Sequence, residues 1–95
     1  MNVRWSDAAL EELGRLVARF QEVAPAYGDR LLERVFQAAD RLALFPESGR
    51  VVPEFGLPEL REVIIRLYRL LYGLGPEGIE IHAVFHGAMQ LNEPD

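Results

Sequence analysis

Apolar side chains recur at helical spacing in the first quarter of the chain, while most charged residues fall outside the stripe. The members of this stripe are Leu10, Leu13, Val17, Phe20 and Ala24. Ser6 stands just before it, where a helix N-cap is expected. The pattern predicts an amphipathic helix that begins after Ser6 and follows a short extended segment, residues 2–5.

A second stripe of the same period follows Pro25. Its members are Leu31 or Leu32, Val35, Ala38 or Ala39, Leu42 and Phe45. Pro46 and Gly49 end the helical pattern. Because only a short turn at Pro25 separates the two stripes, they predict a helical hairpin.

After Pro58 the pattern becomes that of strands. Residues 60–74 and 79–85 are rich in β-branched, leucine and aromatic side chains. The intervening Gly-Pro-Glu-Gly of residues 75–78 predicts a tight turn and an antiparallel hairpin. A continuous strand over residues 60–74 would be about 50 Å long, so we expect a break near Arg66 and Leu67.

The predicted order is β-α-α-β-β-β. It indicates an α+β fold in which a short N-terminal strand and a two-helix hairpin precede an antiparallel sheet of about three further strands. Ninety-five residues suit one domain over residues 1–95, with a single core.

Composition adds limits on function. The chain has no cysteine, which excludes disulfides and thiolate metal sites, and it has no apolar run of membrane-spanning length. Its start does not have the pattern of a signal peptide, so a cytoplasmic location is expected. The net charge is −5, and the last twenty residues contain four acidic residues and no Arg or Lys. An acidic chain is a poor general binder of nucleic acid, whose phosphates attract cations.

Arginine and tyrosine side chains interrupt the apolar run between Gly49 and Tyr72. Guanidinium and phenol groups on a strand cost burial energy unless they are paired or used. Arg61 and Arg69 share a face only if the strand is continuous. They either pair with Glu54 and Glu62, which would fix the preceding loop against the sheet, or take part in binding.

Other residues of this region are also candidates for binding. Arg50 lies in a glycine-containing turn, and Val51, Val52 and Phe55 are the expected exposed apolar surface. Tyr68 and Tyr72 share a face by their spacing. His86 is the one plausible acid–base group, and a period-two strand puts His82 on its face but about 13 Å away, too far to share a metal ion. The predicted contact residues are Arg50, Val52, Phe55, Arg61, Tyr68, Arg69, Tyr72 and His86.

The whole pattern resembles the ParE/RelE superfamily of plasmid-stabilisation toxins from bacterial type II toxin–antitoxin modules. The matching pieces run in order along nearly the whole chain. They are Trp5-Ser6, Leu42-Ala43-Leu44-Phe45-Pro46, Gly49-Arg50, Val52-Pro53-Glu54, Leu60-Arg61-Glu62, Tyr68-Arg69-Leu70-Leu71-Tyr72 and Ala83-Val84-Phe85-His86-Gly87.

The resemblance implies two biochemistries on one fold. ParE-like members inhibit DNA gyrase by protein contact, and RelE-like members cleave mRNA in the ribosome. Both are neutralised by a cognate antitoxin, which carries the DNA-binding part, and a toxin dimer within the hetero-oligomer is compatible with this scheme. No cofactor, metal, membrane or direct DNA contact is implied for this chain.

The charge pattern favours the gyrase inhibitor. Cleavage of RNA needs an acid–base group and cations around the scissile phosphate. Here His86, Arg61 and Arg69 are the only candidates, because the C-terminal segment is acidic. A degenerate member without toxicity is a third reading, for which Ala88 and Gln90 leave room where relatives place at least one Arg.

Overall fold

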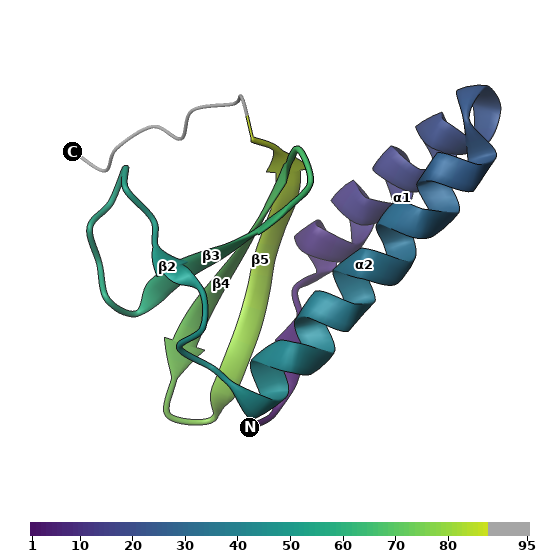
Figure 1. Cartoon of the computed structure of the whole chain (residues 1–95). Coiled ribbons are helices and arrows are strands. Elements are labelled where there is room, and N and C mark those ends of the chain that lie inside the picture. Colours follow the sequence, from purple (N-terminus) through teal and green to yellow (C-terminus); the bar gives the residue numbers. More distant parts are fainter. Residues whose placement is uncertain (88–95) are drawn as a thin grey trace.

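Two helices cover one face of a twisted five-stranded sheet (Figure 1). The structure is a computed structural model and describes residues 1–87. Its elements are β1 (Val3–Trp5), α1 (Asp7–Val23), α2 (Pro25–Leu44), β2 (Arg50–Val51), β3 (Leu60–Ile65), β4 (Tyr68–Gly75) and β5 (Gly78–His86). The predicted α+β class and the order of the elements are confirmed. Neither helix is long and apolar enough to cross a membrane.

The helical hairpin forms as the apolar stripes predict. The Ser6 hydroxyl caps α1 by accepting a hydrogen bond from the Ala9 amide at 3.0 Å. Pro25 occupies the first turn of α2, where its missing N–H is no loss. Two stripe members differ from expectation, because Leu10 and Phe45 are 47% and 54% exposed.

The strands are ordered β1-β5-β4-β3-β2. Three neighbouring pairs are antiparallel, whereas β1 pairs with β5 in parallel. The prediction of a wholly antiparallel sheet with about three later strands therefore missed this one pair and the two-residue β2. The parallel pair joins the two ends of the described fold, since both helices and strands β2, β3 and β4 lie between β1 and β5 in the chain.

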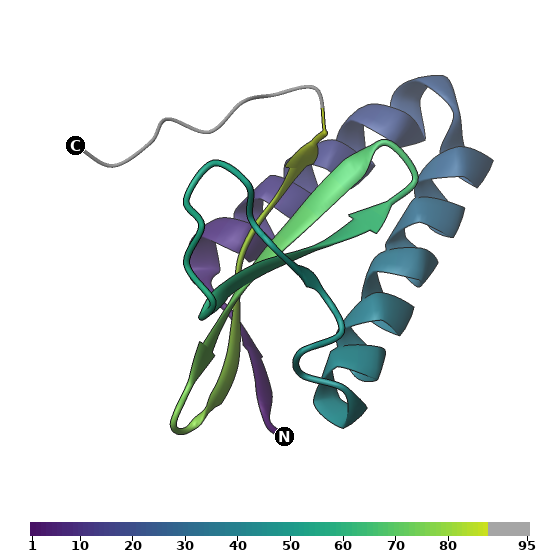
Figure 2. The ribbon, with the colours of Figure 1, turned by 60° about the vertical axis from the view of Figure 1, so that its left-hand side comes forward.

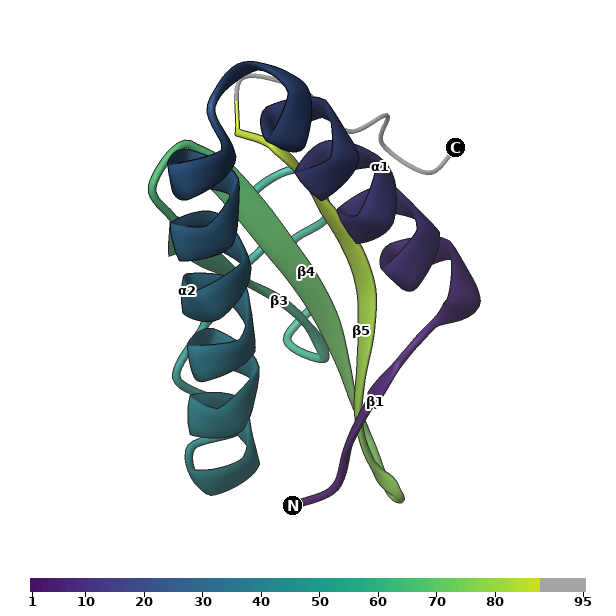
Figure 3. The same cartoon turned by 90° about the vertical axis from the view of Figure 1, so that its right-hand side faces the viewer.

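α1 packs on β5, and α2 packs on β3 and β1, as seen from the helix side (Figure 3). The core between them contains fully buried side chains from both layers, including Leu31, Val35, Leu42, Leu70, Tyr72 and Ile81. We call this side of the sheet the helix face and the other side the open face. The segment after α2 crosses the open face and covers part of it (Figure 2).

The long apolar run breaks where the sequence predicts. β3 ends at Ile65 and β4 begins at Tyr68, and these two residues pair across the turn. Arg66 and Leu67 form the turn, which we call the hairpin tip. Arg66 has a backbone φ of 56° and is the only non-glycine residue with positive φ among residues 1–87.

A register shift in β5 corrects one further expectation. Leu71 pairs with Ala83 while Tyr72 pairs with Ile81, so His82 is the extra residue of a bulge. Ile81 and Val84 both belong to the core, and His86 is opposite Tyr68. His82 and His86 therefore lie on opposite faces, and the prediction that they share one was wrong because a bulge breaks the period of two.

Candidate functional site

Three charged side chains form a buried cluster on the open face. Arg69 on β4 donates from Nε to both carboxylate oxygens of Glu62 on β3, at 2.9 and 3.0 Å. Its two terminal nitrogens donate to Glu54 of the covering segment at 2.7 and 2.8 Å. We call these three residues the charge cluster. Arg69 is 5% exposed and Glu62 is 1% exposed, so the cluster is part of the folded interior.

Hydrogen bonds to Glu54, and then those to Glu62, raise the pKa of Arg69 above its usual value. Its guanidinium also lies 5.3 Å from the centre of the Phe85 ring. Of the two alternatives left open for Arg69, the structure thus shows the pairing with Glu54 and Glu62 that holds the loop against the sheet. The positive charge of Arg69 is compensated inside the protein.

Arg61 lies on the other face and makes different contacts. Its guanidinium donates to the backbone carbonyls of Pro58, Glu47 and Gly49, at 3.0, 3.3 and 3.0 Å. These bonds connect β3 to the segment that leaves α2. The break at the hairpin tip puts Arg61 and Arg69 on opposite faces, so the structure does not bring them together.

Tyr72 holds the same segment from inside the core. Its hydroxyl accepts from the Gly49 amide at 2.9 Å and donates to the Pro46 carbonyl at 2.8 Å. A Cβ atom at Gly49 would lie 2.6 Å from this hydroxyl, so the close approach requires glycine. Burial raises the pKa of Tyr72. Since Tyr72 is fully buried, it offers no surface to a partner in this conformation.

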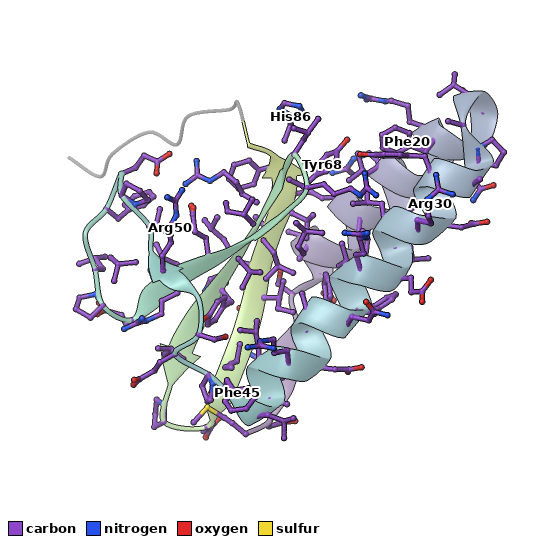
Figure 4. The ribbon with its side chains drawn as sticks, in the orientation of Figure 1. Phe20, Arg30, Phe45, Arg50, Tyr68 and His86 are labelled. Atoms are coloured by element: carbon purple, nitrogen blue, oxygen red, sulfur yellow. The ribbon has the colours of Figure 1, made fainter. Side chains whose placement is uncertain are left out.

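Tyr68 and His86 meet at the upper end of the sheet (Figure 4). Their rings are 5.6 Å apart, and Tyr68 also contacts Phe20 of α1 edge-on at 6.4 Å. Tyr68 is 7% exposed whereas His86 is exposed. Tyr68 and Tyr72 do share a face, as predicted, and it is the helix face.

A cleft of about 890 Å³ opens beside the charge cluster. It lies between the segment after β2, the hairpin tip and the end of β5. Its lining residues are Arg50, Pro53, Glu54, Ile64, Arg66, Leu67, Tyr68, Arg69, His86 and Gly87. Four of the eight predicted contact residues, namely Arg50, Tyr68, Arg69 and His86, therefore come together in one cleft.

The remaining apolar candidates do not line this cleft. Val52 is fully buried, so the expectation that it is exposed was wrong: it belongs to the segment that crosses the open face, and its amide donates to the Leu60 carbonyl of β3 at 3.3 Å. Val51 and Phe55 are half-buried. The exposed apolar surface of the cleft comes instead from Ile64 and Leu67, which are 51% and 65% exposed.

Sequence reasoning missed Ile64, Arg66 and Leu67 as surface residues. Ile64 falls within a predicted strand, and strand periodicity cannot tell which face a covering layer leaves open. The signal for Arg66 and Leu67 was the length of the run, which already required a turn there. Residues at such a tip are exposed whatever their hydropathy.

Residues 1–87 contain no group of three or more His, Cys, Asp or Glu side chains that could hold a metal ion. Ala88 and Gln90 lie outside the described residues. The site that the structure offers is a protein surface with an apolar floor and a partly compensated cationic rim.

Comparison with known proteins gives a family match for nearly the whole chain. Residues 3–91 match the family described as "ParE toxin of type II toxin-antitoxin system, parDE". Among solved structures, the chain is similar to one titled "Chromosomal ParDE TA system from P. aeruginosa", with a TM-score of 0.75 and 13% identity. That match covers 90% of this chain and 95% of the other, and it shows a shared fold. No curated protein gives a significant match.

Proposed function

The chain belongs to the ParE toxin family of type II toxin–antitoxin systems, and we propose that it inhibits DNA gyrase by protein–protein contact. A cognate antitoxin neutralises it by covering the toxin in a complex. The observation that carries the proposal is the family match over residues 3–91.

The chemistry of the site supports a binding protein over a ribonuclease. Ribonuclease action at this sheet would require cations that stabilise the scissile phosphate. Arg69 is bound by two carboxylates and Arg61 by three backbone carbonyls, so both are used within the fold. A net charge of −5 also disfavours approach to an RNA-rich ribosome.

The test measures gyrase activity directly. The purified toxin is added to gyrase and relaxed plasmid, and supercoiling is followed with increasing toxin. We expect a dose-dependent loss of supercoiling that an equimolar amount of antitoxin reverses. Supercoiling that persists at excess toxin would overturn gyrase inhibition.

A parallel assay reports the alternative activities. Primer extension on mRNA from cells that express the toxin alone would reveal codon-specific cleavage by a ribosome-dependent endonuclease. Cuts lost in His86→Ala would establish that alternative. Normal supercoiling, intact mRNA and normal growth together would identify a member that binds its antitoxin without being toxic.

A further inference from the structure

The cleft beside the hairpin tip combines apolar surface with positive charge. Ile64 and Leu67 are more than half exposed, although both belong to a strand-forming, apolar stretch. Exposed aliphatic side chains that gather in one concavity are typical of a surface that another chain covers. The apolar part therefore suits aliphatic or aromatic side chains of a peptide.

Among the described residues around the cleft, positively charged side chains outnumber negatively charged ones. Arg50 and Arg66 stand at its rim, and both are exposed. Nearby, Arg69 lies between Glu54 and Glu62, and Arg50 forms an ion pair with Glu62 at 3.5 Å. Among residues 1–87, three guanidiniums and two carboxylates thus gather at the cleft, in a chain whose net charge is −5. The cleft is a cationic site on an acidic protein, which complements an acidic ligand.

Arg66 occupies a position that favours glycine. The hairpin tip has two residues, and Arg66 is the first of them, with a φ of 56°. A two-residue hairpin turn with positive φ at its first position is most easily formed by glycine. An arginine there strains the backbone, and strained residues cluster at binding sites. Its guanidinium extends from the tip and lies 5.7 Å from the centre of the Tyr27 ring.

We propose that this cleft binds an acidic, apolar peptide segment of the antitoxin. Ile64 and Leu67 contact its apolar side chains, and Arg66 and Arg50 bind its carboxylates. The inference rests on the proposed function for the identity of the partner. It goes further by giving the docking surface, the chemistry of the segment and the residue that selects for acidic side chains.

The test uses overlapping labelled peptides that cover the protein encoded beside the toxin gene, titrated with full-length toxin in fluorescence anisotropy. We expect the tightest peptide to contain both aliphatic and acidic residues. Arg66→Gly should weaken its binding about tenfold, because a charge-assisted hydrogen bond is lost. The variant should remain folded and resist urea at least as well as the parent, since glycine suits the positive φ.

A peptide with its acidic residues changed to glutamine tests whether Arg66 contacts a carboxylate. It should bind the parent toxin at least tenfold more weakly, and its loss of affinity for Arg66→Gly should be clearly smaller, because only the contact with Arg50 remains to be lost there. Losses that are additive in this cycle would overturn the contact between Arg66 and the acidic side chains.

Matched variants separate recognition from structure. Leu67→Asn should also weaken the peptide about tenfold, whereas Leu44→Asn should leave binding unchanged. Leu44 is 75% exposed and lies next to Phe45, at the end of the molecule away from His86 (Figure 4). Tyr27→Leu removes the ring beside Arg66 and should leave binding within about twofold of the parent. Equal losses in Tyr27→Leu and Arg66→Gly would show that Arg66 acts through the fold, which would overturn the proposal.

Failure of this inference is distinguishable from failure of gyrase inhibition. If the antitoxin binds with full affinity to Arg66→Gly and Leu67→Asn, the docking surface is wrong while supercoiling is still lost on adding toxin. If supercoiling is unaffected but the peptide binds through Arg66, only the proposed target is wrong.

Discussion

Arg66 and Arg69 stand three residues apart in one hairpin and have opposite environments. Arg69 is 5% exposed, and two carboxylates bind its guanidinium. Arg66 is exposed at the hairpin tip with a backbone that favours glycine. The pair shows that a charged side chain in the sequence is not always accessible to a ligand, because its charge can be compensated within the fold. Of these two arginines, the one that sequence reasoning selected for binding is the one bound within the fold.

The two environments also differ in how removal of the side chain affects folding. Deleting a buried, hydrogen-bonded charge leaves its charged partners buried with neither an opposite charge nor water to stabilise them. Deleting an exposed charge changes little, and replacing the residue by glycine at a position of positive φ can relieve the backbone. Stability measurements on the two arginines should therefore have opposite signs.

The largest expected effect is that of Arg69→Met. It removes the cation between Glu54 and Glu62, and Glu62 has no exposed side-chain surface. We expect a loss of about 3–5 kcal/mol in the free energy of unfolding, measured by urea denaturation. Arg69→Met with Glu62→Gln should recover part of this loss because one buried charge is also gone.

Arg30→Met is the control, since Arg30 is exposed on α2 (Figure 4). It should change the unfolding free energy by less than about 0.5 kcal/mol. If Arg69→Met were as stable as Arg30→Met, the charge cluster would contribute nothing to folding and the contrast between the two arginines would disappear.

The core-facing side of the same hairpin provides the next effect. Tyr72→Phe keeps the ring but removes the hydroxyl shared by the Gly49 amide and the Pro46 carbonyl. Because the Gly49 amide is buried, we expect a loss of about 1–3 kcal/mol in urea denaturation. Tyr27→Phe, on a partly exposed ring, should lose less than about 0.5 kcal/mol. Equal losses in the two variants would mean that the hydroxyl of Tyr72 is not a specific anchor.

Much of this architecture was predictable because it depends on local pattern. The two helical stripes, the Ser6 cap and the Gly75–Gly78 turn follow from spacing and from turn chemistry. The break at Arg66 was predictable from the length of the apolar run alone, since a small domain has no room for a strand of fifteen residues. The pairing of Arg69 with Glu54 and Glu62 was one of two open alternatives.

What could not be predicted depends on contacts between distant segments. The parallel pairing of β1 with β5 and the bulge at His82 are properties of the pairing between strands, which the local pattern of one strand does not contain. Val52 is buried because the segment after α2 crosses the open face, which no periodicity reveals. For the same reason the sequence does not reveal that Ile64 of β3 and Leu67 of the hairpin tip form the apolar part of a cleft.

Arg66→Gly tests the exposed member of the pair with a smaller effect of opposite sign. A left-handed backbone costs a non-glycine residue about 1–2 kcal/mol, and loss of the contact with Tyr27 offsets about 0.5–1 kcal/mol of the relief. We expect a net gain of up to about 1 kcal/mol in the free energy of unfolding. Arg66→Ala, which keeps the strain and loses the contact, should be less stable than the parent. A destabilised Arg66→Gly would show that the arginine stabilises the turn.

The smallest expected effect is a loss of stability at high pH that comes from the buried tyrosines of the helix face. It vanishes below pH about 10. Burial raises the pKa of both Tyr68 and Tyr72 above the usual value of a tyrosine, about 10. In the unfolded chain these hydroxyls lose their protons first, so above pH about 10 the unfolded state binds fewer protons and stability falls as the pH rises. Below that pH their contribution is complete. The Arg69 pKa is raised as well, so its guanidinium stays charged throughout this range. Urea midpoints between pH 8 and pH 11 should therefore fall less steeply in Tyr72→Phe than in the parent.

The control is Arg66→Gly, whose substitution touches neither hydroxyl. Its urea midpoints should fall with the parental slope over the same pH range. A parental slope in Tyr72→Phe would assign the alkaline loss to groups other than the buried hydroxyl of Tyr72.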